Sequence, residues 1–160
     1  MCLPYIDVLF GIEPYHLWKD EQDHQTGDVK DGVPFQPDFK QQDEVFHGFV
    51  KRYPNIKCIA RHVRYAHSCS ENSLMAYLWY DGKTYESQKL RFHILDRVGG
   101  GDAFVSGIIY ALMNEYKPQD IADFGVAASA VKHTIHGDGN ITDDISLIEH
   151  IMQMNFDIKR

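Results

Sequence analysis

The chain has 160 residues, a formal net charge of −7 and 44% hydrophobic residues, which suits one folded α/β-type domain rather than a disordered segment. The negative charge gives no support to nucleic-acid binding, and no apolar run approaches the ~20 residues that cross a bilayer. The first residues lack the basic start and apolar core of a signal peptide, so we expect a cytoplasmic protein with no membrane or nucleic-acid partner.

Apolar periodicity and turn residues predict an alternation of strands and helices. The expected strands are Ile6–Ile12, Lys57–Val63, Leu74–Tyr80 and Thr84–Phe92, and the expected helices are Asp38–Tyr53, Asp102–Glu115, Pro118–Thr134 and Thr142–Met154. Asp81-Gly82 between two β-rich runs predicts a hairpin. Between Asp20 and Glu44, eight acids and two lysines predict an exposed loop, to which we attach no function. The order of elements predicts a doubly wound, Rossmann-like sheet with flanking helices.

The strongest chemical signal is the segment Asp96-Arg97-Val98-Gly99-Gly100-Gly101-Asp102-Ala103-Phe104. Glycines let the backbone approach a ligand closely, and the free N–H groups at a helix start form an anion site. A carboxylate repels an anion, so Asp102 is not placed there to attract one. It is well placed to take a proton from a hydroxyl while the glycine amides hold phosphoryl charge. The segment therefore indicates phosphoryl transfer, and a helix capped by an aspartate is the structural alternative.

Two other glycine motifs do not fit. The dinucleotide fingerprint G-x-G-x-x-G would need glycine where Phe104 stands. A P-loop that ends in Gly82-Lys83-Thr84 would need glycine where Tyr77 stands, so this segment is interpreted as the turn of the hairpin.

Residues 96–140 resemble the second signature of the ribokinase-like (PfkB) carbohydrate kinases, usually written D-T-x-G-A-G-D-x-F. The two parts here read DRVGGGDAFVSGIIYAL and GVAASAVKHTIHGD, and they are most similar to the 2-dehydro-3-deoxygluconokinase group. The resemblance runs along nearly the whole chain but covers only about the C-terminal half of the family's usual length. It implies a ribokinase-like α/β fold, of which this chain would be one partial domain.

The resemblance also implies roles for individual residues. Asp102 takes the place of the catalytic base, and the anion hole falls on Gly99, Gly100 and Gly101. ATP and Mg²⁺ are the implied cofactors, and the nucleotide-binding positions correspond to Arg64, Gly125 and Ala128. A monovalent cation, present in some members, would be held by Asp96 and by the carbonyls of Val98 and Gly137. Two alternatives stay open: small residues in 125–130 also suit close helix packing, and Asp96 also suits bracing of the turn.

Departures from the family pattern limit the function. Where the family has N-x-x-E, which helps to organise Mg²⁺ and phosphate, this chain has Ile12 and Tyr15 in place of the asparagine and the acid. The family's sugar-binding half has no counterpart here. By ancestry we expect a kinase of 2-dehydro-3-deoxygluconate or a related sugar acid. The alternatives are a non-catalytic remnant that binds nucleotide weakly or not at all, and one half of a split kinase completed as a homo- or hetero-oligomer.

Overall fold

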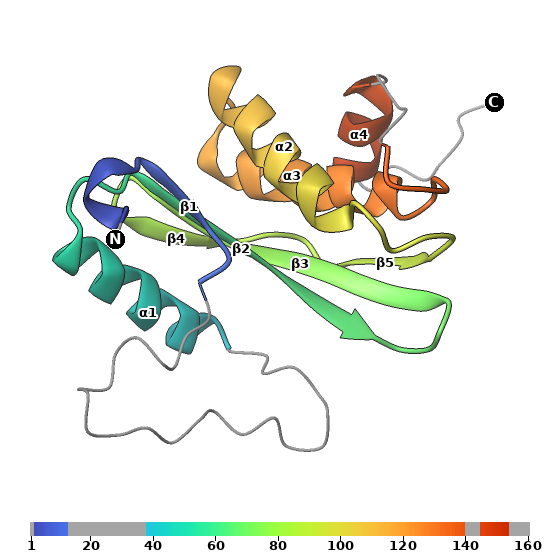
Figure 1. Ribbon diagram of the computed structural model, residues 1–160, viewed down its shortest axis with the longest axis horizontal. Helices are drawn as coiled ribbons and strands as arrows, with labels where there is room; N and C mark the ends of the chain where they lie inside the picture. Colours follow the sequence, from blue (N-terminus) through green and yellow to red (C-terminus); the bar gives the residue numbers. More distant parts are fainter. Residues whose placement is uncertain (1, 13–37, 140–144, 154–160) are drawn as a thin grey trace.

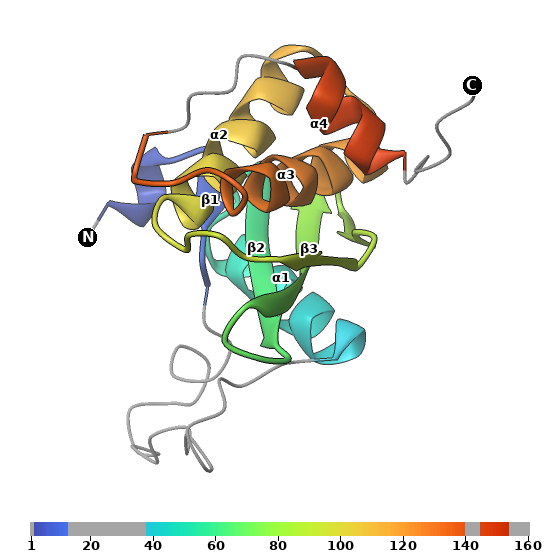
Figure 2. The same ribbon diagram turned by 90° about the vertical axis from the view of Figure 1, so that its right-hand side faces the viewer.

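The computed structural model describes residues 2–12, 38–139 and 145–153. A five-stranded sheet separates helix α1 on one face from helices α2, α3 and α4 on the other (Figure 1). In chain order the elements are η1 (Leu3–Tyr5), β1 (Val8–Phe10), α1 (Phe39–Arg52), β2 (Cys58–Ala66), β3 (Glu71–Tyr80), β4 (Lys83–Glu86), β5 (Leu90–His93), α2 (Gly100–Met113), α3 (Pro118–Lys132) and α4 (Ile145–Met152). Helix α3 contacts the sheet, α2 and α4, which gives the helical layer seen in Figure 2. None of the described helices is long and apolar enough to cross a membrane.

The sheet is mixed. Strand β1 pairs with β2 in parallel, and α1 lies in the long connection between them, whereas β2–β3, β3–β4 and β3–β5 are antiparallel. A short connection permits only the antiparallel arrangement, so the compact segment from β2 to β5 cannot add parallel strands. The predicted α/β, ribokinase-like class with flanking helices is confirmed, although the described sheet contains one parallel pair only.

The predicted hairpin is present, with Asp81 and Gly82 both at positive φ (48° and 80°), as its tight turn requires. The strand expected over Thr84–Phe92 is instead divided into β4 and β5, which follow one another along the same edge of β3. At the break, the Ser87 hydroxyl accepts a hydrogen bond from the Ala76 amide at 2.7 Å. A side chain therefore takes over a ladder position, which an alternating pattern does not reveal.

The helix boundaries follow local capping chemistry. The Asp38 carboxylate accepts from the Gln41 amide at 2.8 Å and the Gln41 side chain accepts from the Asp38 amide, which forms a capping box at the predicted start of α1. Helix α2 begins at Gly100, so the predicted start at Asp102 is two residues late. The predicted start of the last helix, Thr142, lies outside the described residues, and the described helix α4 begins at Ile145.

Two apolar cores lie on opposite faces of the sheet, and β2 contributes to both by alternation. Cys58 and Ala60 face the helical layer of α2 and α3, whereas Ile59 and Val63 face α1. His62 and Arg64 share the parity of Ala60, so they extend toward the helical layer beyond its apolar part. This places His62 beside the start of α2, where its ring packs against Phe104, and Arg64 on the same face of β2.

Candidate functional site

The glycine turn lies at the N-terminus of α2, as the sequence predicts. Gly99 is the N-cap, with φ 78° and ψ −3°, and the Ala103 amide donates the first intrahelical hydrogen bond to the Gly99 carbonyl at 2.9 Å. The amides of Gly100, Gly101 and Asp102 therefore have no acceptor within the helix. Gly101 and Asp102 are exposed, so the positive end of the helix is open to an anion.

The three glycines meet different surroundings. A Cβ on Gly99 would lie 2.7 Å from the Asp138 carbonyl, and one on Gly100 would lie 2.3 Å from Cε1 of His133. A Cβ on Gly101 would meet only Cε1 of His62, at 4.0 Å. The fold thus explains the first two glycines by close approach. It leaves open space on the Cβ side of Gly101, which is exposed.

Asp102 is the third residue of α2 and lies on its exposed surface. Because Gly99 is the N-cap and no side chain caps the helix, Asp102 does not play the capping role of the structural alternative. A carboxylate in a first turn interacts favourably with the helix dipole, by about 0.3–1 kcal/mol. Its oxygens remain available to a hydroxyl beside the open amides, which is the geometry that a general base needs.

Side chains at the C-terminal end of α3 support the glycine turn at residues 99–101. The Ser129 hydroxyl donates to the Gly100 carbonyl at 2.8 Å, and Nδ1 of His133 lies 2.6 Å from the Ser129 carbonyl. Because a carbonyl only accepts, His133 carries its proton on Nδ1. Burial lowers the pKa of His133, while the Ser129 carbonyl opposes that change. The imidazole is therefore neutral near pH 7, and its ring packs directly on Gly100.

A second set of contacts ties the segment before the turn to the loop after α3. The Asp96 carboxylate accepts from the Val98 amide at 3.0 Å and from the Gly137 amide at 2.8 Å, and these bonds hold the pKa of Asp96 below its usual value. Lys132 is fully buried, and its ammonium donates to the carbonyls of Gly137 at 2.7 Å and Ile135 at 3.3 Å. Asp96 thus does brace the segment before the glycine turn. The Gly137 carbonyl, a predicted cation ligand, already accepts a hydrogen bond from Lys132.

Arg64 and His62 approach the same turn from β2. The ring centroid of His62 lies 4.9 Å from that of Phe104, and desolvation there, followed by the charges of His133, Arg61 and Arg64, lowers the pKa of His62. The charge of Arg64 also lowers the pKa of His133. The charge of Arg64, a predicted nucleotide-binding residue, thus acts on His133, which packs on Gly100.

Gly125 and Ala128 lie at the contact between α2 and α3. A Cβ on Gly125 would lie 2.6 Å from Cδ1 of Ile108, and one on Gly107 would lie 2.9 Å from Cβ of Ala128. Both of these predicted nucleotide-binding residues are buried there. Their small size is explained by close helix packing, which is the alternative given above, and their nucleotide role stays a prediction.

Sequence reasoning missed Ser129, Lys132 and His133, which carry the support of the turn. A signal was present: with Gly125, residues Ser129 and Lys132 fall at i, i+4 and i+7, on one stripe of α3. Two polar residues on the stripe that faces α2, in the part of the helix after Asp123 that is otherwise apolar, indicate buried hydrogen bonds. Position alone does not say that their acceptors lie in the glycine turn and the loop after α3.

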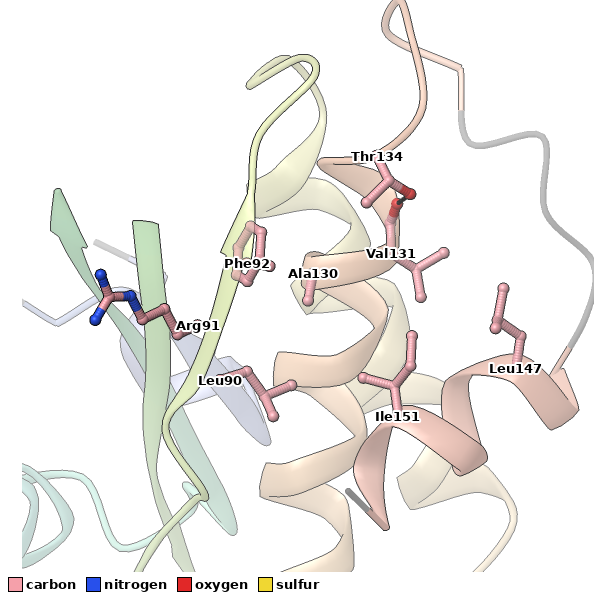
Figure 3. A pocket seen from close by; sticks show the side chains of 8 residues that line it. All are labelled: Leu90, Arg91, Phe92, Ala130, Val131, Thr134, Leu147 and Ile151. Atoms are coloured by element: carbon pink, nitrogen blue, oxygen red, sulfur yellow. Dashed lines mark hydrogen bonds between the residues drawn. The ribbon is translucent and has the colours of Figure 1, made fainter. Parts of the chain in front are cut away.

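A pocket of about 220 Å³ lies elsewhere, between β5, α3 and α4 (Figure 3). It is lined by Leu90, Arg91, Phe92, Ala130, Val131, Thr134, Leu147 and Ile151. The Thr134 hydroxyl already donates to the Val131 carbonyl at 2.7 Å. This mainly apolar pocket includes none of the predicted site residues and offers little for phosphate chemistry.

Part of this chain is similar in sequence to known carbohydrate kinases. Residues 75–145 match the sequence profile of the pfkB family carbohydrate kinases. A 5-dehydro-2-deoxygluconokinase of Clostridium botulinum is 31% identical over 71 residues, which are 44% of this chain and 20% of that protein. One from Clostridium tetani is 32% identical over 78 residues, which are 49% of this chain and 22% of that protein.

Solved structures match most of the chain. The 2-dehydro-3-deoxygluconokinase of Thermotoga maritima superposes with a TM-score of 0.76 at 26% identity, over 95% of this chain and 43% of that one. A PfkB family carbohydrate kinase from Listeria grayi gives a TM-score of 0.68 at 26% identity, over 92% and 42%. A proposed ribokinase II from E. coli, solved with ATP and Mg²⁺, shares the fold at 16% identity, with a TM-score of 0.55 over 76% of this chain and 35% of that one. The matched part thus spans less than half of each kinase, and the predicted resemblance to the ribokinase-like (PfkB) kinases is confirmed.

Proposed function

Because this chain resembles the pfkB family carbohydrate kinases, we propose that it carries the phosphate-binding turn and the general base of an ATP-dependent sugar kinase. The observation that carries the proposal is the pairing of first-turn amides without a helical acceptor, on Gly100 and the exposed Gly101, with the exposed carboxylate of Asp102 in one helical turn. Either feature alone is common. Together they provide partial positive charge for the phosphoryl oxygens and a carboxylate that can take the proton of the acceptor hydroxyl.

The chemistry follows from this pairing. Asp102 takes the proton of an acceptor hydroxyl, and the hydroxyl oxygen forms a bond to the γ-phosphorus of ATP as the bond to the β–γ bridging oxygen breaks and ADP leaves. The amides of Gly100 and Gly101 hold the negative charge of the phosphoryl oxygens. One such donor is worth about 10²–10³-fold in rate, and a general base about 10²–10⁴-fold.

Mg²⁺ is the metal that the family resemblance implies. Among the described residues, no group of three or more His, Cys, Asp or Glu side chains could hold a metal ion. Protein-bound Mg²⁺ usually keeps water and phosphate oxygens and adds only one or two carboxylates. The chain's described residues therefore fit a metal that is bound mainly by the nucleotide, and they do not fit one held by the protein alone.

The acceptor belongs to the same proposal. The curated relatives are named for 5-dehydro-2-deoxygluconate, and the T. maritima structure for 2-dehydro-3-deoxygluconate. Both are deoxy, oxo sugar acids that differ in where the oxo and deoxy carbons stand. We propose a sugar acid of this class and expect the hydroxyl to be delivered to Asp102.

Release of ADP from ATP–Mg²⁺ with each of the two sugar acids tests the proposal. Turnover that requires the sugar and disappears in Asp102→Asn supports it. The matched control is Glu115→Gln, which changes a carboxylate just beyond the other end of α2. Equal loss in both variants would contradict the role of Asp102.

A second function, nucleotide binding without turnover, is favoured by Ile12. Its side chain is 4% exposed and packs in the core beside α1, so it cannot supply the polar group expected at this position of the family's motif. Glu13 and Tyr15 lie outside the described residues. Lost positioning of reactants can cost about 7–11 kcal/mol, which exceeds what a general base supplies. On this account ATP stabilises the chain while neither sugar acid releases ADP. Turnover that appears only with a second chain would favour a site completed by a partner.

A further inference from the structure

Lys132 is unusual because its whole side chain is buried. Burying an ammonium is costly unless hydrogen bonds replace its water. Here Nζ donates to the Gly137 carbonyl at 2.7 Å and to the Ile135 carbonyl at 3.3 Å. Backbone carbonyls gathered around one positive charge are also the ligands that replace the hydration shell of K⁺ in proteins.

The ammonium binds one of the three groups from which a monovalent cation site is predicted, the Gly137 carbonyl, and Asp96 is linked to it through the same residue. Gly137 turns its carbonyl to Lys132 and donates its amide to the Asp96 carboxylate at 2.8 Å. The other oxygen of Asp96 accepts from the Val98 amide. The negative charge of Asp96 and the positive charge of Lys132 thus lie on two sides of the same short loop.

The Lys132 side chain also fills the space beside the Gly137 carbonyl in which a cation would have to lie. A Cβ on Gly99 would lie 2.9 Å from Cε of Lys132, so the lysine stem packs against the N-cap of α2. A separate cation at the Gly137 carbonyl would have to displace this ammonium. The residues present therefore fit a resident lysine charge and do not fit a bound monovalent cation.

We propose that the Lys132 ammonium replaces the monovalent cation, so that this chain keeps the anion-binding turn in place without K⁺ or Na⁺. The part of the proposal that concerns nucleotide rests on the proposed function. The part that concerns the turn itself rests only on the contacts of Lys132, Gly137 and Gly99.

Thermal melting of the full chain tests it, in KCl and in tetramethylammonium chloride at equal ionic strength of about 0.15 M. Tetramethylammonium is too large to enter a carbonyl site, so the difference between the two salts reports a specific K⁺ effect. For the native chain we expect the same Tm in both salts. A higher Tm in KCl would overturn the proposal, whether or not any variant folds.

Two variants sharpen the test. Lys132→Ala removes the stem and leaves room for a cation, so its Tm should fall by several degrees in tetramethylammonium chloride and recover in part in KCl. Lys132→Met keeps an apolar stem as far as the Cε position, with sulfur in place of Cδ, and its terminal methyl group lies too close to the Nζ position for a cation to bind there. Its Tm should also fall, without recovery in KCl. If KCl changed the Tm of Lys132→Ala and Lys132→Met equally, the Lys132 side chain would not be filling a space that a cation can occupy, and the proposal would be contradicted.

ATP–Mg²⁺ added to the native chain separates this proposal from the proposed function. An ATP-induced rise of Tm that is the same in both salts supports both. Absence of any ATP effect in either salt would remove the proposed function, while the melting of the nucleotide-free chain would still decide the role of Lys132. An ATP effect that requires K⁺ would overturn the replacement of the cation by lysine.

Discussion

Gly100→Ala and Gly101→Ala are adjacent, chemically identical changes for which the structure predicts opposite outcomes. In Gly100→Ala the new Cβ would lie 2.3 Å from Cε1 of His133, so the imidazole must move and lose its bond to the Ser129 carbonyl. Overpacking costs about 1–3 kcal/mol, and a helix gains at most about 1 kcal/mol from replacing glycine by alanine. Together with the lost buried hydrogen bond, we expect a loss of about 2 kcal/mol, or a Tm lower by roughly 4–8 °C.

Gly101→Ala meets no atom closer than 4.0 Å and has no positive φ to strain. Its Tm should stay the same or rise by up to about 4 °C, because alanine favours the helix. The methyl group fills the open space beside the amide, however, so a phosphate can no longer approach. A hydrogen bond to a charged group is worth about 1.5–3 kcal/mol, so ATP–Mg²⁺ should bind at least about tenfold more weakly. Melting curves and isothermal titration calorimetry measure both quantities. Unchanged affinity in a folded Gly101→Ala protein would refute the anion-hole assignment, and unfolding of this variant would refute the packing argument.

Two further outcomes follow from the same site. Burial lowers the folded-state pKa of His133 and His62, so the unfolded chain binds more protons than the folded chain as the pH falls below about 6.5. The free energy of unfolding should therefore decrease on acidification, by up to about 1.4 kcal/mol per pH unit for each histidine. His133→Asn, whose amide can still donate to the Ser129 carbonyl, should flatten the Tm–pH curve between about pH 7 and 5. A slope that is unchanged in His133→Asn would contradict the buried neutral imidazole. Asp102→Asn should lower Tm by no more than about 4 °C, because the side chain is exposed and caps nothing and only its interaction with the helix dipole, about 0.3–1 kcal/mol, is lost. It should not weaken ATP binding, since a carboxylate repels the phosphates, yet it should lower any sugar-dependent ADP release by at least about 10²-fold. A larger loss of Tm would indicate a structural role instead.

Local signals in the sequence were sufficient for most of the fold. The capping box of Asp38 and Gln41, the turn at Asp81-Gly82 and proline at the start of α3 are each decided by neighbours in the chain, and the structure places elements where they indicate. The division of β4 from β5 was not predicted. It depends on the Ser87 hydroxyl and on the Asp123 carboxylate, which accepts from the Gln88 amide, and these are contacts between distant segments.

The candidate site also has a part that was predictable from adjacent residues and a part that depends on contacts between distant segments. The glycine run and Asp102 stand together in sequence, so their place at a helix start was predictable from backbone chemistry. The supports of that turn come from the end of α3, and only the folded chain shows that His133 packs on Gly100 and that Lys132 reaches the Gly137 carbonyl. For Gly125 and Ala128, composition could not separate a binding face from a packing face, and the close approach of α2 favours packing.

The central claim is that phosphate binds to the open amides of the first turn of α2. Titration of the ¹⁵N-labelled chain with ATP–Mg²⁺, followed by amide NMR, tests it most directly, with Gly101→Ala as the matched control. The account predicts that the largest shifts fall on the amides of Gly100, Gly101 and Asp102 and that they shrink in Gly101→Ala. Shifts that concentrate instead around the pocket lined by Leu90, Val131 and Ile151, and persist in that variant, would contradict it.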